Sequence, residues 1–196
     1  MLTIDELVKE QNDAEERIFE YSLTLLKPIY EKRRVLVSTI PSFWTAVLEA
    51  SELLAEYITY EDTEAIDSLR EVHIDWDTDN VKNFTISLGF DENPYFESTV
   101  LKKSFEYNSE FQRHTSQKVD ILWKQGKDLT KPRPGRDTSF FNWFAYEGKE
   151  EGDDDGAEIA QIIRDDLYPH ALELYRNAQQ DAIEPEYDIS ESGDEK

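Results

Sequence analysis

The sequence contains no cysteine. A disulfide framework, a thiolate metal site and a cysteine nucleophile are therefore excluded, and the composition fits a reducing compartment. Long apolar runs are also missing, because no stretch approaches the roughly 18 apolar residues that span a bilayer. The first six residues, Met1–Glu6, have neither the basic start nor the apolar run of a signal peptide. We therefore expect a soluble, intracellular protein that does not bind membranes.

Catalytic motifs are missing as well. The three histidines, His73, His114 and His170, show no His-x-x-x-His or Glu-x-x-His spacing. No Gly-x-Ser-x-Gly, Walker or dinucleotide-binding glycine pattern occurs. Pairs of carboxylates are frequent, but among 44 acidic residues such pairs arise by chance. We therefore predict a non-enzymatic protein without a catalytic residue, a metal ion or a cofactor.

Basic residues are scarce, with 21 Lys and Arg against 44 Asp and Glu, which gives a formal net charge of −23. Phosphate backbones and anionic lipid surfaces repel such a chain, whereas a basic partner is attracted to it. The alternative interpretation is that the acidic residues only keep the protein soluble. Disorder does not explain the composition, because 4 Trp, 10 Tyr and 10 Phe are spread through the sequence.

Residues 3–40 are predicted to form one long helix, in which apolar or small side chains recur three and four residues apart, as in a coiled coil. This stripe consists of Ile4, Leu7, Ala14, Ile18, Tyr21 and Leu25, and continues with a shifted phase through Leu26, Ile29, Val35, Leu36 and Ile40. The helix would be ~57 Å long at 1.5 Å per residue, with a kink at Pro28. A domain of this size cannot bury one narrow stripe over that length, which predicts a homodimer. The alternative is a helix that folds back on its own domain.

The middle of the chain is predicted to contain short helices followed by an antiparallel sheet. Pro41 ends the long helix, and Ser42 is expected to cap a second helix that reaches Leu54. A short helical turn over 61–69 follows. From 70 to 124 the period of apolar residues changes to two. This pattern predicts four strands joined as a meander with one wet face, near 72–76, 84–90, 95–107 and 119–123.

A basic loop follows the predicted sheet. Its five cationic residues are Lys124, Lys127, Lys131, Arg133 and Arg136. A solvated connection that balances local charge is the simplest interpretation. An alternative is a weak contact of residues 124–136 with DNA phosphates or with the acidic side of a partner complex. A nuclear import signal is a third alternative, but the cationic residues are too dispersed to indicate one.

The last third of the chain combines aromatic and acidic segments. Residues 139–144 are predicted to be helical and aromatic, and an acidic loop over 147–155 follows them. Asp155 and Glu158 resemble a capping box at the start of the next helix. A last helix is expected after Pro169.

Negative charge is concentrated toward the C-terminus, where the segment from Tyr146 onward holds 17 acidic and 4 basic residues. The run Glu150–Asp155 contains carboxylates that could chelate Ca²⁺, but it lacks the EF-hand spacing. A solvated charged loop is the simplest interpretation. We favour presentation of these carboxylates to Lys and Arg of a partner, because the adjacent aromatic helix could fix their orientation.

Six stretches occur in series: KPIYEKR at 27–33, IPSFW at 40–44, FDENPYFE at 90–97, WKQGKDLTK at 123–131, SFFNWF at 139–144 and IRDDLYP at 163–169. In this order they resemble the SET branch of the nucleosome assembly protein family, also called template-activating factor I. The resemblance covers the chain from about residue 3 to residue 178. No single stretch is a catalytic motif, and the assignment depends on the series.

The resemblance implies an α+β fold in a headphone-shaped dimer. Residues 1–40 would form the long dimerisation helix. Residues 41–180 would form the histone-binding domain, a four-stranded antiparallel sheet packed with helices, and residues 181–196 an acidic, disordered tail. Two departures from the family pattern are a short loop after Lys131 and a brief acidic tail, which put tail-dependent activities in doubt.

The resemblance also implies a histone chaperone that acts in the nucleus, with the cytoplasm as a further location. It would bind either or both core-histone pairs at the acidic underside of the domain. Carried over by position, the contact region is Asn142 with residues 153–158, to which we add nearby carboxylates. The candidate histone-binding residues are thus Asn142, Glu150, Glu151, Asp153, Asp154, Asp155, Glu158, Asp165 and Asp166.

Two other functions compete with this hypothesis. The rival is an acidic inhibitor or adaptor that binds a phosphatase or a histone acetyltransferase through the surface of the sheet. An unrecognised hydrolase is a distant third, and its candidate residues would be the three histidines.

Overall fold

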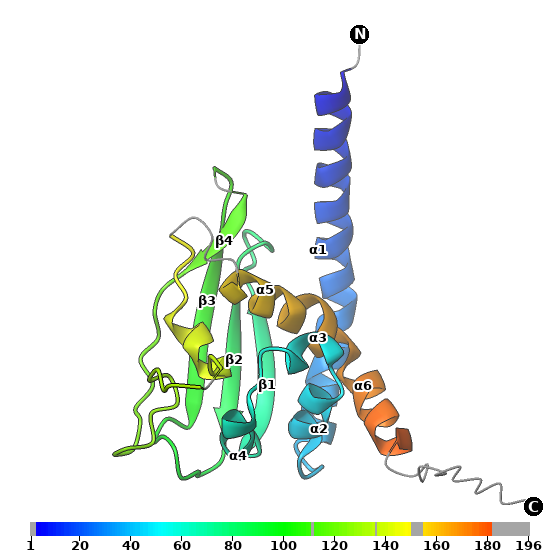
Figure 1. Cartoon of the computed structure of the whole chain (residues 1–196). Coiled ribbons are helices and arrows are strands. Elements are labelled where there is room, and N and C mark those ends of the chain that lie inside the picture. The colour runs from blue at the N-terminus through cyan, green and yellow to red at the C-terminus, as the bar shows by residue number, and fades with distance from the viewer. Residues whose placement is uncertain (1–2, 111, 136, 150–154, 182–196) are drawn as a thin grey trace, which may run out of the picture.

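The computed structural model describes residues 3–110, 112–135, 137–149 and 155–181. The strands β1 (Leu69–Trp76), β2 (Phe84–Phe90), β3 (Val100–Asn108) and β4 (Arg113–Ser116) form one antiparallel sheet in this order. The helical elements are α1 (Ile4–Val37), α2 (Phe43–Glu49), α3 (Glu52–Ala55), η1 (Tyr60–Asp62), α4 (Thr63–Ile66), η2 (Phe140–Ala145), α5 (Asp155–Ile162), η3 (Ile163–Leu167) and α6 (Tyr168–Asp181). Helix α1 stands beside β1, at one edge of the sheet (Figure 1). The α+β fold class is confirmed.

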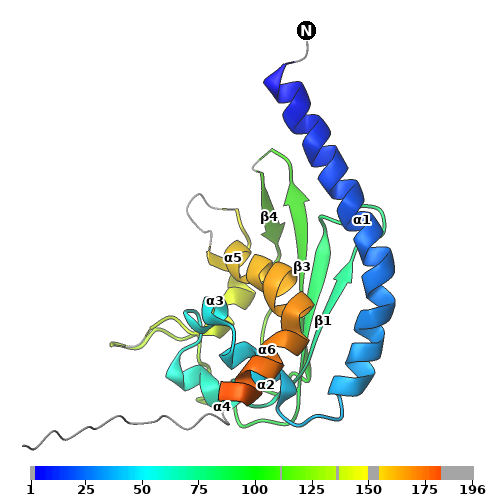
Figure 2. The same cartoon turned by 90° about the vertical axis from the view of Figure 1, so that its right-hand side faces the viewer.

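Helix α1 begins with a capping box between Thr3 and Glu6. The Thr3 hydroxyl accepts a hydrogen bond from the Glu6 amide, and the Glu6 carboxylate accepts one from the Thr3 amide. The helix runs unbroken through Pro28 for 34 residues. Its C-terminal half packs on the domain, whereas its N-terminal half extends beyond the domain (Figure 2). No helix in the described ranges is long and apolar enough to cross a membrane.

The turn into α2 differs from the expected cap. Ser42 adopts a left-handed backbone conformation with φ of 55°, and its side chain makes no capping hydrogen bond. The predicted cap at Ser42 is therefore wrong, because this residue serves the tight turn after Pro41 instead. A serine cap does occur one helix later, where the Ser51 hydroxyl accepts a hydrogen bond from the Leu54 amide at 3.4 Å.

The first two strands lie where alternation placed them, with Val72 paired to Leu88 and Trp76 to Phe84. The predicted fourth strand is wrong. The amide of Val119 donates to the carbonyl of Phe144 in η2 at 2.8 Å, so this backbone bonds to a helical turn and not to a strand ladder. Beyond one isolated bridge between Phe96 and Trp123, segment 119–123 makes no strand.

Two further corrections concern the other side of the sheet. Strand β3 begins at Val100, since Asn93 Oδ1 holds the preceding turn by accepting from the amides of Tyr95 and Phe96. The fourth strand is Arg113–Ser116, a polar segment paired with the end of β3.

The C-terminal helices are contiguous. Helix α5 passes directly into η3, a π-helical turn, and η3 into α6. Pro169 is the second residue of α6 and directly follows the π-helical turn, so its missing amide donor falls where the regular α-helical pattern is already interrupted. The separate start predicted after Pro169 is therefore replaced by one bent helical run that packs across the sheet (Figures 1 and 2).

Candidate functional site

The aromatic segment η2 is fixed at its start by a buried carboxylate. Asp62, with 0% exposure, accepts hydrogen bonds from the Ser139 hydroxyl and from the Phe140 amide, the latter at 2.9 Å. The same carboxylate accepts from the amide and the hydroxyl of Thr59 at 3.0 and 2.8 Å. Four donors offset the cost of burying this group. One side chain thus caps both η1 and η2.

The end of η2 is fixed by a buried lysine on the inward face of β3. Lys103 is 1% exposed, and its Nζ donates to three backbone carbonyls. The acceptors are Tyr146 at 2.7 Å, Gln117 at 2.9 Å and Phe144 at 3.1 Å. Because Gln117 follows β4, Phe144 lies at the end of η2 and Tyr146 follows η2, Lys103 joins the segment after β4 to the end of η2.

The start of α5 is attached to the same aromatic base. Trp143 Nε1 donates to the Gly156 carbonyl at 2.9 Å. A Cβ at position 156 would lie 2.1 Å from Tyr146 Cγ, so only glycine fits against this ring. Tyr146 in turn donates from its hydroxyl to the His114 carbonyl at 2.8 Å. Tyr146 and Gly156, which lie on either side of the acidic segment in the sequence, are therefore both packed on the domain.

Several of the predicted histone-binding residues lie outside the described residues. These are Glu150, Glu151, Asp153 and Asp154, and the side chain of Asp155 is also outside them. Asp155 is the first residue of α5, and Glu158, one turn later, is exposed. Their capping box and their role in binding stay predictions.

The pair Asp165 and Asp166 lies in the π-helical turn η3. Both carboxylate oxygens of Asp165 accept hydrogen bonds from the Arg164 guanidinium at 2.6 Å. Arg164 also lies 4.8 Å from the centroid of the Phe84 ring. A basic ligand at Asp165 must therefore compete with Arg164.

His114 lies near Arg164. Burial lowers the pKa of His114, whose Nε2 lies 2.9 Å from the Lys82 carbonyl oxygen.

Asn142 occupies a different environment. It is half-buried on η2 and lines a pocket of about 140 Å³ between η1 and the basic loop. Glu61 lies on one wall of this pocket, and Lys131 and Arg133 lie on the other. The structure thus brings Asn142 next to the basic loop.

The predicted dimerisation residues form what we call the outer stripe of α1. It consists of Ile4, Leu7, Ala14, Ile18, Tyr21, Leu25, Ile29 and Leu36, all of which are exposed. The exposed fraction is 80% for Ile4 and 67% for Ile18 and Tyr21. Within the described ranges no segment covers this stripe, which sequence periodicity identified correctly as apolar.

A second set of α1 side chains, the inner stripe, packs against the domain. It consists of Phe19, Leu23, Leu26, Tyr30, Arg33 and Val37. Arg33 is buried between aromatic rings, with its guanidinium carbon 4.2 Å from the Tyr168 ring centroid and 4.6 Å from that of Tyr30. It also donates to the Tyr168 carbonyl, and burial lowers its pKa.

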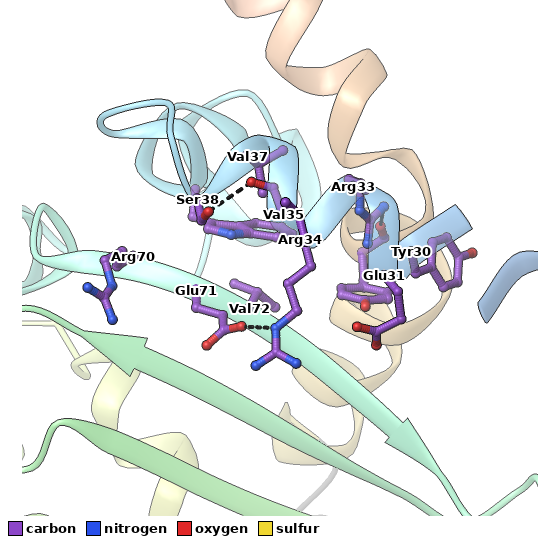
Figure 3. A pocket seen from close by; sticks show the side chains of 12 residues that line it. Tyr30, Glu31, Arg33, Arg34, Val35, Val37, Ser38, Arg70, Glu71 and Val72 are labelled. Carbon is purple, nitrogen blue, oxygen red and sulfur yellow. Dashed lines mark hydrogen bonds and ion pairs between the residues drawn. The ribbon is translucent and has the colours of Figure 1, made fainter. Parts of the chain in front are cut away.

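Beside Arg33 a cleft of about 560 Å³ separates the end of α1 from β1. Figure 3 shows the Arg34 side chain reaching across this cleft to the Glu71 carboxylate, with which it forms an ion pair. Arg70 lies at the far side of the cleft in the same view. The exposed side chains in this cleft are thus of both signs.

Sequence reasoning missed Asp62, Lys103 and Arg33, the three buried charges that hold the domain together. Lys103 leaves a signal, because it falls at an inward position of the alternating strand Leu101–Phe105, and Asp62 leaves one, because it follows Thr59 at the spacing of a capping box. The partners Ser139 of Asp62 and Tyr168 of Arg33 lie 77 and 135 residues away in the sequence. No local pattern reports such contacts.

Comparison with known proteins identifies relatives over nearly the whole chain. The family model of the nucleosome assembly protein (NAP) matches residues 5–178. NAP1-related protein 2 of Oryza sativa subsp. indica is 33% identical over 186 residues, which cover 88% of this chain and 73% of that protein. Protein SET of Drosophila melanogaster is 32% identical over 188 residues, with 88% and 68% covered.

Solved structures share the fold. The crystal structure of Ccp1 has a TM-score of 0.82 at 31% identity and covers 94% of this chain and 96% of its own. The crystal structure of the Vps75 histone chaperone has a TM-score of 0.75 at 27% identity, with 89% and 94% covered. The long helix, the antiparallel meander and the family match agree, and this chain belongs to the nucleosome assembly protein family, in which SET is among its relatives.

Proposed function

We propose that this chain is a histone chaperone that binds core histones, shields them from non-specific contacts with DNA and assists nucleosome assembly and disassembly. The observation that carries the proposal is the family match over residues 5–178, on a fold shared with the Vps75 histone chaperone. The net charge of −23 supports it, because histones are basic. We expect it to act in the nucleus, where nucleosomes form, with the cytoplasm as a further location.

The proposed chaperone is a homodimer joined through the outer stripe of α1. Its large side chains remain at least half exposed in the single chain, from 50% for Leu7 to 80% for Ile4. Heptad spacing fits a second copy of the same helix, because the seam of a coiled coil is such a narrow stripe. Dimerisation would place two acidic domains on one rod.

Histones would be held by carboxylates of the acidic segment and of α5, with Asn142, Asp165 and Asp166 as further contacts. An exposed ion pair contributes only about 0–1 kcal/mol, so affinity must come from many pairs and from two copies of the site. The anchoring of Gly156 to Trp143 and Tyr146 supports a rigid base for these carboxylates. A rigid base loses less conformational entropy on binding than a disordered tail.

Titration of core histones with the protein tests the proposal. Affinity should fall clearly between about 0.1 and 0.5 M NaCl, because the Debye length shrinks from ~10 Å toward ~4 Å. Affinity that stays flat over this range would refute electrostatic shielding. Parallel assays with a protein phosphatase and a histone acetyltransferase distinguish the chaperone from an inhibitor or adaptor of those enzymes.

A charge-neutralising variant tests the proposed location. Asp153→Asn and Asp154→Asn with Glu158→Gln should leave a folded dimer that loses histone affinity. Removal of residues 182–196 should do less. The matched control neutralises three exposed acids of α1, Glu10, Asp13 and Glu20, and should leave binding nearly unchanged. A larger loss from removing the tail would show that the site is misplaced.

A further inference from the structure

A groove between α4 and the basic loop lies next to the pocket at Asn142, away from α5. Its volume is about 490 Å³. Acidic and aromatic side chains line one wall, and the loop from Gly126 to Arg133 forms the other. Glu61, Leu129 and Arg133 also line the smaller pocket at Asn142, so the two hollows are continuous.

One wall presents an aromatic ring and two carboxylates on a single helical face. Tyr60 in η1, Glu64 in α4 and Asp67 at the C-terminal cap of α4 follow one another at spacings of four and three residues. Tyr60 is 91% exposed, and Glu64 and Asp67 are exposed as well. An aromatic ring this exposed, beside carboxylates, suits a flexible cationic side chain.

A cation of the chain already occupies the groove. Lys127 Nζ lies 5.1 Å from the centroid of the Tyr95 ring, within the range of a cation–π contact. The Tyr95 hydroxyl donates to Glu64 Oε2 at 2.8 Å. This hydrogen bond raises the pKa of Tyr95 and adds electron density to its ring. Tyr95 and Glu64 therefore form one cation-binding pair.

The loop that carries this cation has a glycine in a left-handed conformation directly before it. Gly126, directly before Lys127, has a φ of 75°, and a side chain there would meet no other atom within 4 Å. Lys127 itself is exposed. Its amide donates to the Lys124 carbonyl at 3.0 Å, which closes a four-residue turn. Rotation at Gly126 would withdraw the ammonium group without disturbing the core.

We propose that this groove is a docking site for an extended, lysine- or arginine-bearing segment of a basic protein, and that Lys127 is the internal competitor which this segment displaces. The inference rests on the proposed function and adds a second contact surface to it. Charge complementarity with Glu64 and Asp67 favours a basic segment on their wall, and Lys127 and Arg133 are the cations of the opposite wall. A metal ion is not favoured, because no group of three or more His, Asp or Glu within the described part of the chain is arranged to hold one.

The test measures binding of a fluorescent peptide of alternating lysine and glycine to the full chain by anisotropy, in about 0.1 M salt. Lys127→Gln should tighten binding about two- to fivefold, because the competitor is removed. Glu64→Gln keeps an acceptor for Tyr95 but removes the charge, and should weaken binding by a similar factor. Lys9→Gln, on the N-terminal half of α1, is the control for net charge and should have no effect.

Each outcome bears on the proposal. Unchanged or weaker binding with Lys127→Gln would overturn it, as would equal tightening by Lys127→Gln and Lys9→Gln, which would indicate a bulk charge effect. Unchanged binding of the peptide by Glu64→Gln would also overturn the proposal, because Tyr95 and Glu64 would then not bind its cation. Core histones are titrated in parallel. If the peptide responds as expected while core histones do not bind, the groove is supported and the chaperone function is refuted.

Discussion

The inner and the outer stripe of α1 have similar side chains and opposite surroundings. Leu23, on the inner stripe, is 4% exposed, whereas Leu25, two residues later on the outer stripe, is 55% exposed. The inner stripe packs on aromatic residues of the domain, since Phe19 and Tyr30 both contact Trp76. Within the described chain the outer stripe has no such cover. The apolar period in the sequence thus marked the face of α1 that its own domain leaves exposed, and not the face that packs on the domain.

The two stripes also differ in length. The inner stripe begins at Phe19, whereas the outer stripe begins at Ile4. The first half of the helix has a single apolar face, and the ion pair of Glu16 with Lys82 at 2.6 Å links it to the domain. The proposed homodimer would bury this apolar face, which the chain's own domain leaves exposed.

The largest expected effect comes from breaking the outer stripe. Replacing Ile18 and Leu25 together by Asp should raise the dissociation constant of the dimer at least about a hundredfold, because carboxylates would be buried in the seam. The domain should remain folded, as its contacts lie on the other stripe. Sedimentation equilibrium and circular dichroism measure both properties. Thr24→Asp with Lys27→Asp, exposed positions on neither stripe, is the control. If the variant is still dimeric, the outer stripe does not form the dimer interface.

The next effect comes from the inner stripe. Leu23→Ala in the monomeric background should lower the free energy of unfolding by about 2–5 kcal/mol, because a buried leucine leaves a cavity. Working with monomers separates folding from dimerisation. Ile29→Ala on the outer stripe should change the same quantity by less than about 0.5 kcal/mol. Urea unfolding measures both variants. Equal decreases in the free energy of unfolding would show that the two stripes contribute equally to the stability of the domain.

A smaller loss is expected from the one charged member of the inner stripe. Arg33→Met keeps the length of the side chain but leaves the Tyr168 carbonyl without this donor, at a cost of about 1–3 kcal/mol. Arg33→Lys should restore little stability, because an ammonium group cannot lie flat between the two tyrosine rings. Full rescue by lysine would show that charge alone matters at this position.

The smallest expected change in stability comes from the ion pair that links the N-terminal half of α1 to the domain. Lys82→Gln removes the partner of Glu16, and the pair is partly exposed to solvent. The expected change in the free energy of unfolding is about 0–1 kcal/mol, and it should vanish at high salt. A loss that persists at about 1 M NaCl would mean that Lys82 acts by packing.

The spacing of apolar residues in the sequence predicted the elements whose formation depends on neighbouring residues. The heptad spacing located α1, and alternation located β1 and β2. Strand β4 has the sequence Arg113–Ser116 without an apolar alternation, so only its pairing with β3 makes it a strand. Segment 119–123 does alternate, yet the Val119 amide bonds to the carbonyl of Phe144 in η2 and the Trp123 amide to that of Ile121. The contact of Lys127 with Tyr95 joins two loops, and no spacing in the sequence indicates it.

The most direct test of the account compares histone binding by the dimer and by the folded monomer. Core histones are titrated against the wild-type chain and against the Ile18→Asp, Leu25→Asp variant at equal concentrations of domains. The account predicts at least about tenfold weaker binding by the monomer, because the dimer presents two acidic domains on one rod. Equal affinity per domain would contradict it, and would show that α1 contributes nothing to histone binding.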